Sequence, residues 1–87
     1  MVANRDYEVS VYPNPVSELM TIENDDIKDV SSIQLYTQDG RVAKNITFDI
    51  NNTRMQVNVS DLTTGMYNLT TLYQDGQRVT KRIIIQN

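Results

Sequence analysis

Apolar and polar residues alternate along most of this 87-residue chain, and this period of two constrains its fold more than any other feature. Side chains of a β-strand point alternately to its two faces, whereas a helix repeats every ~3.6 residues. The alternating runs are rich in threonine, valine, isoleucine and tyrosine, which strands favour. They cover residues 7–11, 19–23, 32–37, 42–48, 55–59, 67–73 and 77–85. The pattern predicts about seven short strands.

The residues between these runs are turn formers. Asp39-Gly40 and Asp75-Gly76 each separate two alternating runs, which predicts type I′ hairpin turns with positive φ at both central residues. Tyr12-Pro13-Asn14-Pro15 ends the first run, because its prolines fix φ and lack an amide hydrogen. Turn signals at intervals of about 8–12 residues are typical of a sandwich. We therefore predict an all-β fold, a single antiparallel two-sheet sandwich, with a small barrel as the alternative.

The composition excludes several classes of protein. The chain has no cysteine for disulfides or thiolate metal sites, and no histidine as a general base or metal ligand. Its net charge is −3, and no dense basic stripe is present, so we expect no nucleic-acid partner. No apolar run approaches the ~18–20 residues that span a bilayer, so we expect no direct membrane insertion.

Catalysis has little support in the sequence. Without histidine or cysteine, a site would need paired carboxylates, lysine or tyrosine. The acidic residues between positions 23 and 29 lack the regular spacing and the glycine of a calcium loop, so we interpret them as a solvated loop. We expect no enzyme activity, no cofactor and no metal site. The lysines of the chain are Lys28, Lys44 and Lys81, and none lies in a sequence context that is recognisable as that of a catalytic nucleophile.

Four short stretches, in order, resemble the type A C-terminal sorting domains of the type IX (Por) secretion system. The first is an opening proline box, the second a strand–turn–strand motif, the third an L-x-x-G-x-Y motif, and the fourth a basic and then apolar last strand. In this chain they are Tyr12-Pro13-Asn14-Pro15, residues 33–42 with Asp39-Gly40, Leu62-Thr-Thr-Gly65-Met-Tyr67, and Lys81-Arg82-Ile83-Ile84-Ile85. The resemblance spans roughly residues 9–86.

This resemblance implies an Ig-like antiparallel β-sandwich of about seven strands that ends a larger secreted protein. Residues 1–6 are then the chain start or a linker from upstream cargo, and residues 7–87 are the sorting domain. The implied partners are the type IX translocon, its shuttle protein and a sortase-like peptidase that cuts before Tyr7. The precursor passes through the periplasm to the outer membrane and cell surface. The residues expected to be recognised by the translocon are Pro13, Asn14, Pro15, Asp39, Gly40, Gly65, Tyr67, Lys81, Arg82, Ile83, Ile84 and Ile85.

The motif residues also have physical roles of their own. Gly65 precedes a strand, where we expect a left-handed or tight backbone. The Tyr67 ring can cap one end of the sandwich while its hydroxyl reaches backbone, as in a tyrosine corner. In the last strand, Ile83 and Ile85 share one face, and Ile84 lies on the other. A last strand with apolar residues on both faces and a free edge is a candidate docking strand.

Two other functions fit the same alternating pattern. A fibronectin-like or carbohydrate-binding accessory module would present exposed aromatic rings, for which Tyr12 and Tyr36 are candidates. A self-associating module would form a homodimer by edge-strand pairing or strand exchange through the last strand. A glycan-binding assay distinguishes the carbohydrate-binding module from the sorting domain, and sedimentation distinguishes the self-associating module.

Overall fold

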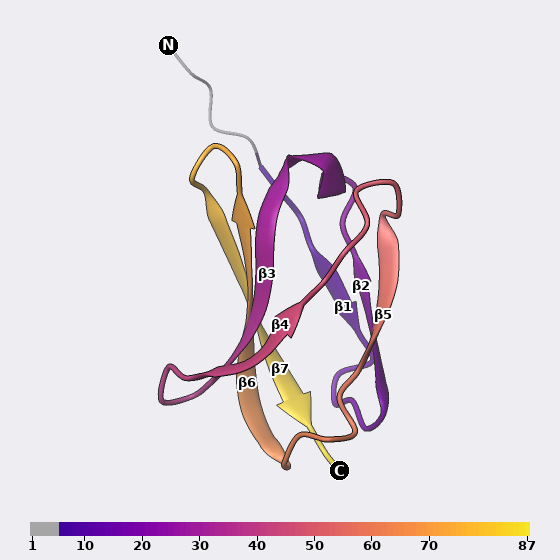
Figure 1. The fold of residues 1–87 in the computed structure, drawn as a ribbon. Coiled ribbons are helices and arrows are strands. Elements are labelled where there is room, and N and C mark those ends of the chain that lie inside the picture. The colour runs from indigo at the N-terminus through magenta and orange to yellow at the C-terminus, as the bar shows by residue number, and fades with distance from the viewer. Residues whose placement is uncertain (1–5) are drawn as a thin grey trace.

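The computed structural model describes residues 6–87, which fold into two antiparallel sheets packed face to face (Figure 1). One sheet has three strands in the order β1-β2-β5, and the other has four in the order β4-β3-β6-β7. The strands are β1 (Ser10–Tyr12), β2 (Leu19–Glu23), β3 (Val30–Thr37), β4 (Val42–Ile46), β5 (Arg54–Asn58), β6 (Gly65–Tyr73) and β7 (Arg78–Ile85). The predicted all-β sandwich of seven strands is confirmed, and the barrel alternative is wrong.

The fourth strand determines how the strands are divided between the sheets. In the constant-type immunoglobulin arrangement, the fourth strand joins the sheet of the first, second and fifth. Here β4 instead pairs with β3, which gives the division of three and four. A short 3-10 helix, η1 (Ile27–Asp29), leads from β2 into β3. No helix in the described chain is long and apolar enough to cross a membrane.

Two expected strands are shorter by at least two residues than the alternation suggested. The first begins at Ser10 rather than Tyr7, and the fourth ends at Ile46 rather than near Phe48. In both cases the missing residues still pack on the core, because Tyr7 and Phe48 are half-buried against it and Val9 is 3% exposed. Alternation reports which side chains are buried, whereas a strand also needs a paired backbone.

The core lies between the sheets and is built from the inward-facing residues of both. The side chains of Tyr67, Leu69, Thr71 and Tyr73 point inward along β6 and are all buried, while their neighbours are half-exposed. The buried hydrophobic residues are Val9, Val16, Met20, Ile22, Ile27, Val30, Ile33, Leu35, Ile46, Val59, Tyr67, Leu69, Tyr73, Ile83 and Ile85. Burial of this apolar area is the main stabilising term for the fold.

Both Asp-Gly pairs form hairpin turns, but the predicted type I′ geometry is wrong. Only the glycines have positive φ, 89° at Gly40 and 92° at Gly76, and the aspartates do not. Each hairpin has a three-residue loop with two hydrogen bonds, as when Thr37 N–H donates to the Arg41 carbonyl and Gly40 N–H to the Thr37 carbonyl. A turn followed by a left-handed glycine is the usual three-residue alternative.

Candidate functional site

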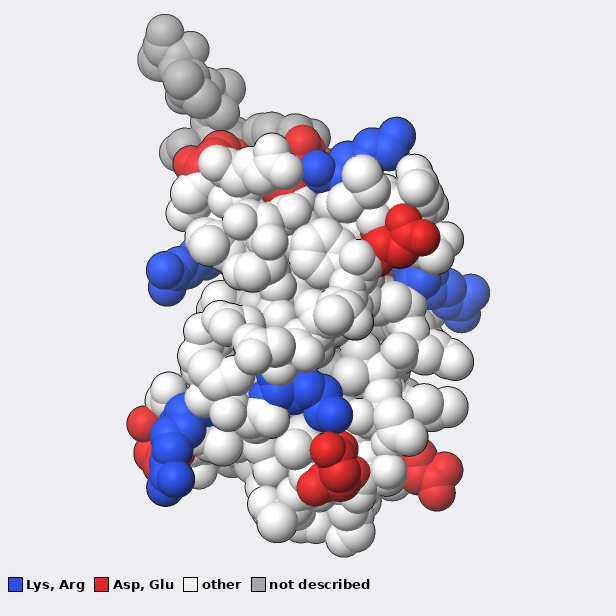
Figure 2. Space-filling view, in the orientation of Figure 1, with Lys and Arg blue, Asp and Glu red and all other residues white. Residues whose placement is uncertain are grey.

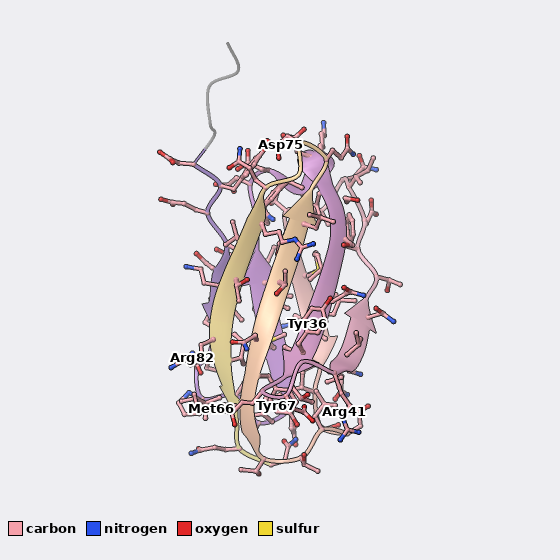
Figure 3. The ribbon with its side chains drawn as sticks, turned by 90° about the vertical axis from the view of Figure 1, so that its left-hand side faces the viewer. Tyr36, Arg41, Met66, Tyr67, Asp75 and Arg82 are labelled. Atoms are coloured by element: carbon pink, nitrogen blue, oxygen red, sulfur yellow. The ribbon has the colours of Figure 1, made fainter. Side chains whose placement is uncertain are left out.

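Most of the nominated residues gather at one end of the sandwich. This end, called here the C-terminal end, is formed by the β3–β4 turn, the start of β6 and the end of β7, and the chain terminates there (Figure 1). Figure 3 shows Arg41, Met66, Tyr67 and Arg82 in this part, whereas Asp75 lies at the opposite end. Motifs far apart in sequence meet because β6 pairs with β3 on one side and with β7 on the other.

The last strand places its isoleucines on two faces, as predicted. Ile83 and Ile85 are 1% and 0% exposed in the core, and Ile84 is 38% exposed on the outer face of the sheet. Ile84 is paired with Met66 of β6 across that face. Ile83 and Ile85 therefore hold the fold together, and only Ile84 among the three offers a sizeable surface to another protein.

The end of β7 does not have the free edge that the sequence suggested. Residues 13–16, here called the edge strap, run alongside it with a parallel bridge between Val16 and Ile85. Val16 N–H donates to the Ile84 carbonyl at 2.9 Å, and Gln86 N–H donates to the Val16 carbonyl at 2.9 Å. The expectation of a free edge is therefore wrong for this half of β7, because the chain crosses over to pair with its own last strand.

The Asn14 side chain extends this pairing by one more position. Its Oδ1 accepts a hydrogen bond from Ile84 N–H at 2.9 Å, and its Nδ2 donates to the Arg82 carbonyl at 3.1 Å. These are the two bonds that a backbone amide would make here, so the side-chain amide takes the place of the main chain. The flanking Pro13 and Pro15 have no N–H of their own, and both peptide bonds that precede them are cis. The proline box thus contacts β7 through Asn14.

A second group of nominated residues lines a groove at the same end. The groove has a volume of about 350 Å³ and lies between the β3–β4 turn and the start of β6. Asp39, Gly65 and Tyr67 all line it. The hydroxyl of Thr37 and the guanidinium of Arg41, 3.1 Å away, hold the pKa of Asp39 below its ordinary value. Asp39 is thus a carboxylate at neutral pH.

Tyr67 forms the predicted corner. Its ring is 5% exposed, and its hydroxyl donates to the Thr63 carbonyl, four residues upstream, at 2.7 Å. Of the left-handed or tight backbone expected at Gly65, the left-handed alternative is wrong, because within residues 6–87 only Gly40 and Gly76 have positive φ. A Cβ atom at Gly65 would meet only the Tyr67 ring, at an ordinary 4.0 Å. Gly65 is the first residue of β6 and pairs with Ile85.

Two contacts that fix the ends of the described chain were not predicted from the sequence. The first is made by the C-terminal residue, Asn87. The side-chain amide of Asn87 donates to the Val59 carbonyl at 2.9 Å and also to the Leu62 carbonyl. Its backbone N–H donates to the Thr64 hydroxyl at 3.0 Å. The C-terminus is therefore tied to the loop before β6, and no local motif around residue 87 signals this.

The second such contact lies at the opposite end, where the described chain begins. The ring of Tyr7 stacks on that of Tyr73, with centroids 3.7 Å apart, and its hydroxyl donates to Asp75 at 2.8 Å. The backbone N–H of Gln77 and this hydroxyl lower the pKa of Asp75. Burial raises the pKa of Tyr73, whose hydroxyl accepts a bond from Asn24 at 2.9 Å. This contact explains why the alternation of apolar and polar residues begins at Tyr7, before the first strand.

Charge is distributed unevenly over the surface. On the face seen in Figure 2, acidic side chains lie toward the two ends, and the middle, over β3 and β4, has none. The four-stranded sheet contains no aspartate or glutamate in any strand. Three of its four basic residues are exposed on β7, namely Arg78, Lys81 and Arg82. Within residues 6–87, no group of three acidic side chains is arranged to hold a metal ion.

Comparison with known proteins identifies a family to which the chain is similar. The sequence model of a family described as "Secretion system C-terminal sorting domain" matches residues 10–86, which is nearly the whole chain. No curated protein and no solved structure matches.

Proposed function

Because this chain belongs to the family of type IX secretion C-terminal sorting domains, we propose that residues 7–87 form a non-catalytic domain that is read at its C-terminal end and then cut from its cargo. Membership implies a C-terminal signal for type IX secretion, interaction with the secretion machinery, and export to the cell surface or outside. The translocon and its shuttle protein bind this end. A sortase-like peptidase then cleaves before Tyr7, which leaves residues 1–6 with the cargo.

The observation that carries the proposal is the meeting of the four motifs. The edge strap lies along one side of the end of β7, and the start of β6, which lines the groove with Asp39, pairs along its other side. The edge strap and the groove are surface features, and binding at them requires neither an enclosed active site nor a reactive side chain. Both therefore suit recognition by another protein. Two nominated exposed side chains, Arg82 and Ile84, lie on one face of β7.

The anchoring of Tyr7 supports the proposed cleavage boundary. Val9 is 3% exposed in the core, and Tyr7 is held by its stack on Tyr73 and its bond to Asp75. A peptidase needs an extended, accessible segment, so peptide bonds after Tyr7 are protected by the fold. Cleavage before Tyr7 leaves the sandwich intact.

Secretion of a reporter fused to residues 1–87 in a host with a type IX system tests the proposal. Ile84→Asp places a charge on the C-terminal end of the four-stranded sheet, and Leu19→Asp is a matched control on the other sheet. Both side chains are exposed, at 38% and 48%, so both variants are expected to fold. We expect the Leu19 variant to reach the surface and the Ile84 variant to stay in the periplasm. Retention of both, or export of both, contradicts recognition of the outer face of the four-stranded sheet at this end.

A further inference from the structure

The outer edge of β7 has a second half that the edge strap does not cover. Ile84 directs both its N–H and its C=O to the strap, so every second residue before it has the same outward orientation. Thr80 therefore points an N–H and a C=O outward. Arg82 points out an N–H, because Asn14 occupies its carbonyl. Within residues 6–87, these three groups have no hydrogen-bond partner.

A groove runs beside this open edge. It has a volume of about 270 Å³ and separates β7 from β1, the edge strand of the other sheet. Its walls are Val9, Ser10, Val11, Asn14, Lys81, Arg82 and Ile83. Unpaired backbone groups beside a groove are the requirement for adding an extended strand from another protein.

The charges along the open edge indicate which kind of strand could bind there. The side chains of Arg78, Lys81 and Arg82 are exposed, and the strands of the four-stranded sheet contain no acid. Within residues 6–87, none of the three forms an ion pair. A second copy that paired through the same edge would bring three cations against three, and like charges on neighbouring strands are destabilising. An extended segment with acidic side chains would meet opposite charge at the same positions.

We propose that the edge from Arg78 to Arg82 is a strand-addition site for an extended acidic segment of another protein. The inference rests on the proposed function, since that protein would belong to the secretion machinery. The backbone groups of Thr80 and Arg82 bond to the added strand, and the cations of β7 pair with its acidic side chains. The edge strap fixes the register, because Asn14 prevents the added strand from continuing past Arg82.

The test uses a capped heptapeptide in which glutamate alternates with valine and threonine, and a second with lysine in place of glutamate. Each is titrated into labelled protein of residues 1–87, and the amide signals are followed by NMR. We expect the glutamate peptide to shift the amides of Thr80 and Arg82 and to slow their exchange with solvent. We expect no such change with the lysine peptide.

Two variants separate the backbone from the charges. Thr80→Pro removes the outward N–H while it keeps every cation, and Thr80→Ala removes only the hydroxyl. Loss of a strand hydrogen bond and crowding by the proline ring should weaken peptide binding by about tenfold or more in the proline variant alone. The triple variant R78E/K81E/R82E keeps the N–H and should instead prefer the lysine peptide. Thermal unfolding checks that each variant is folded.

Equal binding of the two peptides, or full binding to the Thr80→Pro variant, would overturn the proposal. A dimer of the unmodified protein that pairs through Thr80, detected by sedimentation and NMR, would overturn it in favour of self-association. The titration needs no host, so it decides on the site whether or not a reporter is exported. If the Thr80→Pro reporter reaches the surface at the unmodified level, strand addition is not how the domain is read, and the sorting function stands.

Discussion

The two halves of β7 differ although they form one continuous strand. In the C-terminal half, Ile83 and Ile85 are buried, and the edge strap pairs with the outer edge. In the half that begins at Arg78, the side chains are mostly exposed, basic residues predominate, and the outer edge is open. The difference teaches that a last strand can stabilise a domain with one half and present a free backbone edge with the other.

The largest expected effect comes from the core of the closed half. Ile85 is 0% exposed, so Ile85→Ala should lower the free energy of unfolding by about 3–4 kcal/mol, from lost burial and the cavity left behind. Val79→Ala in the open half removes a half-buried side chain and should cost about 1 kcal/mol. Urea unfolding measures both. Equal losses would mean that the two halves are packed alike.

The edge strap provides the next comparison. Asn14→Ala removes both side-chain bonds to β7, at Ile84 N–H and the Arg82 carbonyl, and should cost about 1–2 kcal/mol of unfolding free energy. Asn52→Ala is the matched control, because its exposed side chain bonds to nothing in the described chain, and it should cost less than about 0.5 kcal/mol. Similar losses of unfolding free energy in the two variants would mean that the edge strap does not stabilise the end of β7.

Two tyrosine hydroxyls contrast the two ends of the sandwich. Tyr67→Phe removes a half-buried bond to the Thr63 carbonyl and should cost about 1 kcal/mol of unfolding free energy. Tyr7→Phe removes an exposed bond to Asp75, which water can replace, so its cost should be about 0.5 kcal/mol or less. Thermal or urea unfolding ranks them. A larger loss for the Tyr7 variant would reverse the expected order.

The smallest effect is a pH dependence shared by the two Asp-Gly turns. The pKa values of Asp39 and Asp75 are both lowered by hydrogen bonds in the folded state. Their stabilising contribution is complete above the unfolded pKa of about 3.9 and is lost as the pH falls through the lower folded values. The melting temperature of the double variant D39N/D75N should therefore fall less between pH 6 and pH 3 than that of the unmodified chain. Equal falls would contradict these contacts.

Features that depend on nearest neighbours in sequence could be predicted from the sequence. Alternation placed Ile83 and Ile85 on one face of the last strand and Ile84 on the other, because side-chain direction repeats every two residues. The Asp-Gly pairs located both hairpins. The loop length did not follow, because it depends on the register of the paired strands, and here it leaves Asp39 with negative φ.

The contacts between distant segments could not be predicted in the same way. Asn14 and Ile84 are separated by 70 positions, and nothing local to either indicates that a side-chain amide would replace a strand backbone. The clamp on Asn87 and the stack of Tyr7 on Tyr73 are of the same kind. The family resemblance identified four motifs in order along the chain, but not which of them meet. Nothing in the sequence indicated that the edge strap would cover the end of β7, so a free edge was expected there.

Native-state hydrogen exchange of the β7 amides, read residue by residue, tests the division of this strand most directly. We expect slow exchange at Ile84 and Gln86, whose N–H groups bond to Asn14 and Val16, and fast exchange at Thr80 and Arg82, whose N–H groups face solvent. Protection at Thr80 and Arg82 equal to that at Ile84 would contradict it.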